Sequence, residues 1–207
     1  MLRIDGASGP AYCTRPVQAS DALFLAGGGL VAGVVNTLAG GGSLLTVPLL
    51  TFLGLPGSVA NGTNRVGVLL QSGVASWGFW REGVSGVRSA LPLLLPVAAG
   101  ALLGAFGGAF QAGVGILLLY ALSAGGSDLV RSNAVKVVLN FCFSLLVLPV
   151  FVSARQVALP EALALGAGFA AGGLAGPRIA VRGGERVIRP VLACAVVALA
   201  GRMLGLY

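Results

Sequence analysis

The sequence predicts an all-α integral membrane protein, a polytopic helical bundle of two related repeats. The first observation is composition, because 57% of the 207 residues are hydrophobic and only 9% are charged. Ordinary soluble domains carry about 25% charged residues, so a soluble chain of this size could not cover its surface with so few. The second is that the long apolar runs are rich in glycine and alanine and lack two-residue alternation, which favours helices over an outer-membrane barrel.

The N-terminal tail, residues 1–20, lacks the apolar core of a signal peptide and is predicted to be disordered. Residues 21–207 are predicted to form a single membrane domain. Its apolar segments lie at about 22–54, 58–80, 90–122, 133–152, 159–177 and 188–206.

Two of these segments, the first and the third, are too long for one crossing of about 20 residues and too short for two. Each contains a glycine cluster, which is Gly40–Gly42 in the first and includes Gly113 and Gly115 in the third. A glycine inside a helix costs about 1 kcal/mol relative to alanine, so three in a row should interrupt it. The sequence therefore predicts glycine-broken or re-entrant helices, and about six or seven membrane segments in all.

The third observation is an internal repeat. When the chain is shifted by 72 positions, residues 40–104 match 112–176 at sixteen of 65 pairs, among them Asn61 with Asn133. The first repeat covers about 21–106 and the second about 107–206. Repeats with interrupted segments at corresponding positions are typical of secondary transporters, in which the broken helices meet near the membrane midplane.

The net charge of +7 is interpreted as arginines that flank the spans and face the cytoplasm or anionic lipid, and no nucleic-acid partner is predicted. The most basic connector, residues 177–190, is the best cytoplasmic anchor. There is no histidine, and the three cysteines have no paired spacing. We therefore predict no metal site, no cofactor and no enzymatic activity.

Polar residues within the apolar segments form two stripes, each on one face of a predicted helix. The stripes consist of Asn61, Asn64, Arg65, Ser72 and Ser76, and of Asn133, Lys136, Asn140 and Ser144. Polar groups in spans are candidates for function, and cations with neutral donors suit an anion path. Two other interpretations remain open. Arg65 and Lys136 could snorkel to the headgroups, and the Asn and Ser side chains could join helices by hydrogen bonds.

These residues resemble the TauE/SafE sulfite exporter family of bacterial permeases. The resemblance rests on the glycine turn Gly40–Gly42, on Gly54–Pro56 and on Ala60 with Thr63–Arg65, and it extends over about residues 21–206. It implies an inner-membrane permease with two related halves. Family members usually carry a further span between the halves, whereas here the second motif follows the first repeat directly.

We therefore expect a multi-pass permease of the bacterial inner membrane that moves a small anion, such as sulfite or a sulfonate, by alternating access. Its partners would be this anion and the lipid bilayer, and its oligomeric state is not predicted. The alternative is a shortened, non-transporting structural or interaction protein derived from such a permease. The expected substrate-binding residues are Gly40, Gly41, Gly42, Asn61, Thr63, Asn64, Arg65, Gly113, Gly115, Asn133, Lys136 and Asn140.

Overall fold

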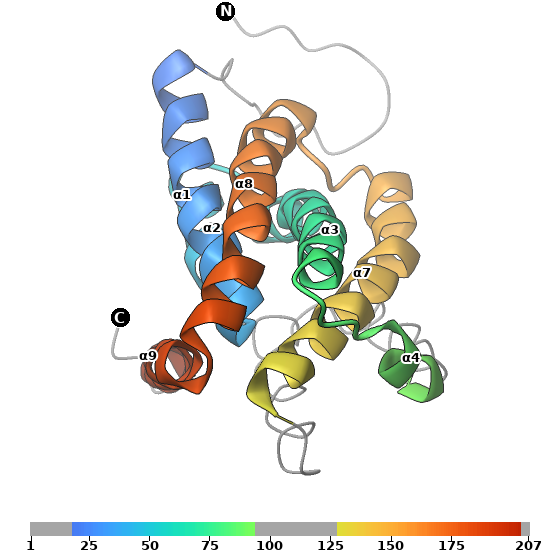
Figure 1. Cartoon of the computed structure of the whole chain (residues 1–207). Coiled ribbons are helices and arrows are strands. Elements are labelled where there is room, and N and C mark those ends of the chain that lie inside the picture. Colours follow the sequence, from blue (N-terminus) through green and yellow to red (C-terminus); the bar gives the residue numbers. More distant parts are fainter. Residues whose placement is uncertain (1–17, 94–127, 204–207) are drawn as a thin grey trace, which may run out of the picture.

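The computed structural model describes residues 18–93 and 128–203, and every regular element within them is helical (Figure 1). The first group of helices is α1 (Ala19–Ala39), α2 (Gly42–Phe52), α3 (Gly57–Arg81), α4 (Val87–Ala90) and the short 3-10 helix η1 (Leu91–Leu93). The second group is α7 (Leu129–Ser153), α8 (Leu159–Gly183) and α9 (Glu185–Met203).

The predicted glycine break separates α1 from α2. Gly40 adopts a left-handed conformation with φ of 84°, and its N–H donates to the carbonyl of Asn36 at 2.9 Å. This cap favours glycine, because a side chain is strained at positive φ. The chain then reverses, since Gly42 lies against Asn36 and Leu49 lies against Gly28. The first long segment is thus a hairpin of one full-length helix and an 11-residue return helix.

Helix α8 lies between α1 and α3 (Figure 1). It runs parallel to α1, because Gly33 packs on Phe169 and Thr37 packs on Gly176. Helix α3 has the same direction, and Gly78 meets Pro177. Small residues let these backbones approach closely, which is how helices associate where lipid removes the hydrophobic driving force.

Helix α7 packs on α3 and runs antiparallel to it. Gly62, near the start of α3, meets Phe151 near the end of α7, and Gly73 meets Phe141. The C-terminal ends of α1, α3 and α8 therefore share one end of the bundle with the start of α7. We call this the arginine-rich end, since most of the arginines in the described part of the chain lie there.

Three described helices, α1, α7 and α8, are long and apolar enough to cross a membrane. The predicted six or seven segments are therefore supported only as far as these three. Helix α3 is also long, with 25 residues, but it carries a polar stripe and is not one of these three. Helix α9 corresponds to the predicted segment 188–206 and is not one of the three either. Helix α1 begins at Ala19, whereas most of the predicted tail of residues 1–20 lies outside the described residues.

Candidate functional site

Arg65 is the basic residue of the α3 stripe, and its side chain is buried against α7 with only 5% of the residue exposed. Its guanidinium carbon lies 4.9 Å from the ring centre of Phe143 and 5.8 Å from that of Phe151. Both rings offer a negative face to the cation. Within the described residues, Nε and Nη1 of Arg65 have no hydrogen-bond acceptor. Buried guanidinium nitrogens without acceptors are costly, which makes Arg65 a candidate for binding an anion.

Two serines on the same pair of helices have a similar deficit. The buried hydroxyls of Ser76 on α3 and Ser144 on α7 contact no hydrogen-bond partner in the described part of the chain. Ser76 lies eleven residues after Arg65, on the same helix face, and Ser144 follows Phe143 directly. The α3–α7 interface thus holds a cation and two hydroxyls whose hydrogen-bonding capacity is unused among these residues.

Asn64, the neighbour of Arg65, joins α3 to the return helix α2. Its Nδ2 donates to Ser43 Oγ at 2.8 Å, and Thr46 Oγ1 donates to its Oδ1 at 2.6 Å. Asn64 therefore fixes the position of α2 just after the glycine break. Its amide has both an acceptor and a donor from the protein itself.

Lys136, the cation of the second stripe, is completely buried and turns toward the end of α1. Its Nζ donates to the carbonyls of Asn36 at 3.1 Å and Thr37 at 3.0 Å, and to Asn133 Oδ1 at 2.7 Å. Asn133 Nδ2 donates in turn to the carbonyl of Leu38 at 2.9 Å. These carbonyls form the negative end of the α1 dipole, which a cation stabilises. The snorkelling interpretation of Lys136 was therefore wrong, because its three donors are used inside the bundle.

A further polar chain, which the sequence analysis did not single out, lies beside this cap. Asn36 Nδ2 donates to Gln71 Oε1 at 2.7 Å, and Gln71 Nε2 donates to Thr37 Oγ1 at 2.7 Å. Asn36 and Thr37 stand four and three residues before Gly40, and Gln71 follows Asn64 by seven residues. Their polarity inside apolar segments was the signal that could have found them.

The other predicted site residues have varied positions. Thr63 Oγ1 accepts the N–H of Ala158 at 3.0 Å, and Ala158 caps the start of α8, so Thr63 joins two helices. Asn61 and Asn140 are half-buried on α3 and α7. Gly113 and Gly115 lie outside the described residues.

The charged groups of the two stripes are both cationic. Of the described carboxylates, Glu161 is buried in the first turn of α8, and its Oε2 has no hydrogen-bond partner among the described residues. Among the described residues there is no group of three or more His, Cys, Asp or Glu side chains that could hold a metal ion. The groups of Arg65, Ser76 and Ser144 that lack a partner in the described part of the chain are hydrogen-bond donors to an anion that could accept from them.

Comparison with known proteins agrees with this membrane architecture. The family model described as sulfite exporter TauE/SafE matches residues 25–107 and 97–203. The chain belongs to this family. Two relatives of this TauE/SafE chain are known by name. A Sinorhizobium protein called probable membrane transporter protein ORF9 is 25% identical over 239 aligned positions, covering 88% of this chain and 92% of the relative.

A second relative, a probable membrane transporter protein of Haemophilus influenzae, is 36% identical over 76 residues. That match covers 37% of this chain and 30% of the relative. The 239 positions of the longer alignment exceed the 207 residues of this TauE/SafE chain, so the Sinorhizobium protein has residues there that this chain lacks. No solved structure matches significantly.

Proposed function

We propose that this TauE/SafE chain is a multi-pass permease of the bacterial inner membrane that moves a small oxyanion by alternating access. The observation that carries the proposal is Arg65, a buried guanidinium whose Nε and Nη1 have no acceptor among the described residues. Guanidinium groups bind oxyanions through paired, charge-assisted hydrogen bonds. Sulfite and organic sulfonates present the oxygens that such a fork would bind.

Under this proposal the two cations have different roles. Arg65 contacts the anion at the α3–α7 interface. The hydroxyl of Ser76, about 16 Å farther along α3, and that of Ser144 contact it at other points of its path. Lys136 and Asn133 hold the end of α1 at the glycine break, so they shape the path without contacting the substrate. Phe143 and Phe151 stabilise the cation by 4.9 and 5.8 Å ring contacts while leaving its in-plane donors for a ligand.

The test is counterflow of radiolabelled sulfite in liposomes containing the purified full chain. Arg65→Ala should lower the flux by about tenfold or more, because a hydrogen bond to a charged group contributes about 1.5–3 kcal/mol. Arg65→Lys keeps the charge but loses the planar fork, so it should retain only part of the flux. Arg131→Ala, at an exposed arginine outside the stripe, is the control and should transport normally. Normal flux in Arg65→Ala would refute the assigned site.

The alternative of a shortened, non-transporting protein has one observation in its favour, the residues that the Sinorhizobium relative has and this chain lacks. The same liposomes decide between the two. If the wild-type chain moves neither sulfite nor any of a panel of small sulfonates faster than empty liposomes, the permease proposal fails for these substrates. A structural or interaction role would then be the better account.

A further inference from the structure

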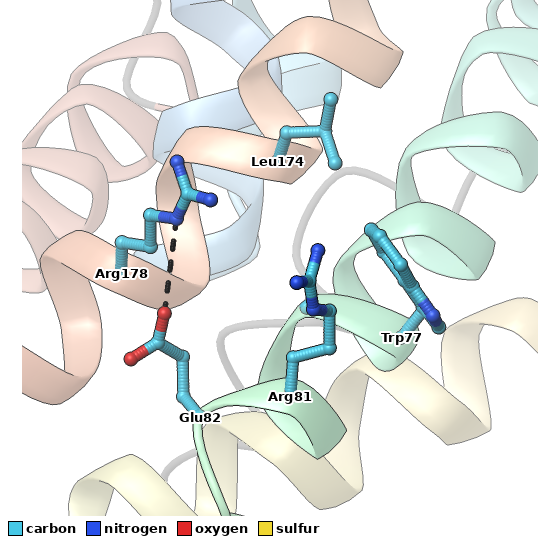
Figure 2. A pocket seen from close by; sticks show the side chains of 6 residues that line it. Trp77, Arg81, Glu82, Leu174 and Arg178 are labelled. Atoms are coloured by element: carbon cyan, nitrogen blue, oxygen red, sulfur yellow. Dashed lines mark ion pairs between the residues drawn. The ribbon is translucent and has the colours of Figure 1, made fainter.

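A polar pocket lies at the arginine-rich end, between the C-terminal parts of α3 and α8. Its volume is about 150 Å³. It is lined by Trp77, Gly78, Arg81, Glu82, Leu174 and Arg178 (Figure 2). Figure 2 shows the guanidinium groups of Arg81 and Arg178 in the space between the two helices, one from each side. None of these residues belongs to the stripes, so the pocket is separate from the Arg65 site.

Arg81 is held in place by an aromatic ring. Its guanidinium carbon lies 4.8 Å from the ring centre of Trp77, one turn earlier on α3. Stacking on an indole face uses the flat surface of the guanidinium and leaves its N–H groups, which lie in the plane, for a ligand. The contact therefore orders a cationic side chain at the pocket without satisfying its donors.

Arg178 is only weakly neutralised. Its Nε lies 3.7 Å from Glu82 Oε1, and the arginine side chain is 66% exposed. An ion pair of this length and exposure has little strength. In Figure 2 the terminal nitrogens of Arg178 lie on the far side of the guanidinium from Glu82. With two arginines and one carboxylate, the pocket has a net charge of +1.

The surroundings of the pocket are those of a membrane interface. Trp77 and Trp80 are 48% and 66% exposed at the end of α3, and tryptophans concentrate where lipid headgroups meet the acyl chains. Leu174, which is 45% exposed on α8, adds an apolar wall. The pocket thus combines a cationic floor, sized for a small anionic group, with an apolar side that continues along the helix surface.

We propose that this pocket binds the phosphate group of an anionic phospholipid, with Arg81 and Arg178 on the phosphate oxygens and an acyl chain against Trp77 and Leu174. Inorganic phosphate shares the charge but gains nothing from the apolar wall. Lipid is therefore the favoured source of the phosphate. Lipid binding at this pocket does not require transport, so its test is independent of the test of the permease function.

The test uses the two tryptophans of the chain. Trp80→Phe leaves Trp77 as the single fluorophore, and the full-length variant is placed in phosphatidylcholine vesicles containing brominated lipid, which quenches tryptophan on contact. Brominated phosphatidylglycerol should quench Trp77 at a severalfold lower mole fraction than brominated phosphatidylcholine. One basic residue at an anionic surface contributes about fivefold in binding, so Arg81→Gln and Arg178→Gln should each reduce the preference by about that factor.

Two matched variants make the test specific. Arg88→Gln, at an exposed arginine of the same end but outside the pocket, should leave the preference unchanged. Glu82→Gln should increase the preference, because it removes the pocket carboxylate and releases Arg178. Equal quenching by the two lipids, an equal effect of Arg88→Gln, or loss of the preference in millimolar inorganic phosphate would each overturn the proposal.

Discussion

Two buried cations on neighbouring helices have opposite hydrogen-bonding states. Lys136 uses its three donors on Asn36, Thr37 and Asn133, whereas Nε and Nη1 of Arg65 have no acceptor among the described residues. Both residues looked alike in the sequence, since each stands in a polar stripe of an apolar segment. Lys136 is therefore fully engaged within the protein, and under the proposed function Arg65 is the group that a ligand would satisfy.

For Lys136 we expect a loss of stability. Lys136→Ala removes the donor for two carbonyls and for Asn133 Oδ1, and each buried polar group left unsatisfied costs about 1–3 kcal/mol. Thermal unfolding of the purified variant in detergent should occur at a clearly lower temperature than for the wild type. Arg65→Met is the contrasting variant and should unfold at the wild-type temperature or above, since it replaces a buried charge without acceptors by an apolar chain. The opposite order of the two melting temperatures would contradict these roles.

The limits of sequence prediction at this scale are visible in the same residues. Helical spacing placed Asn64, Arg65 and Ser72 on one face, and all three are buried in the structure. The spacing of these polar residues does not predict which helix packs against that face. Lys136 bonds to carbonyls 99 and 100 residues away, and no local pattern identifies such a partner.

At the scale of elements, the tight contact between α1 and α8 depends on glycine. A Cβ added at Gly33 would lie 2.7 Å from the carbonyl oxygen of Phe169 and 3.1 Å from the Cα of Gly172. Backbone atoms cannot yield as a flexible side chain can, so the two helices would have to separate.

Gly33→Ala should therefore destabilise the protein by about 1–3 kcal/mol, the usual cost of overpacking a close contact. Gly27→Ala, on the same helix, is the matched control, because nothing lies within 4 Å of an added Cβ there. The control should be neutral or slightly stabilising, since alanine favours a helix more than glycine does. The measurement is thermal unfolding of both variants in the same detergent, and equal melting temperatures would disprove the packing argument.

Sequence reasoning identified the elements better than their arrangement. The apolar segments at 58–80 and 133–152 correspond to α3 and α7 within four residues. Helix α8 continues six residues past the predicted segment 159–177, into the predicted connector 177–190. The glycine run predicted the break between α1 and α2, because consecutive glycines are poor helix formers. That α8 would lie between α1 and α3 was not predictable, since the glycines that permit it are spread over three helices and match only in space. The predicted repeat, with its second break at Gly113 and Gly115, stays a prediction.

At the scale of the whole molecule, the arginines of the described residues are distributed unequally between the two ends of the helix bundle. The arginine-rich end carries Arg81, Arg88, Arg131, Arg178, Arg182, Arg186 and Arg189, together with the carboxylates Glu82, Asp128 and Glu185. Among the described residues the opposite end carries Arg155 and the carboxylates Asp21 and Glu161. Basic residues near span ends remain in the cytoplasm, so we expect the arginine-rich end to face it.

This orientation is testable with single cysteines in a chain whose own cysteines are replaced by alanine. Ser20→Cys lies at the start of α1, and Ser85→Cys lies between α3 and α4, at the arginine-rich end; both positions are exposed. In intact cells a membrane-impermeant maleimide should label Ser20→Cys, whereas Ser85→Cys should react only after lysis. The reverse labelling pattern would mean that the charge distribution does not set the topology.

The ammonium group of Lys136 at the end of α1 has a consequence for energetics. In transporters with broken helices, a cluster of carbonyl oxygens at such an end can coordinate a sodium ion. Here that cluster already holds a positive charge covalently attached to α7. The side chain of Lys136 thus takes the place of a bound cation at these carbonyls, and it does not dissociate during a transport cycle. We expect anion flux to be the same when external sodium is replaced by choline. A strict sodium requirement would mean that sodium binds to a different group of oxygen ligands in the chain.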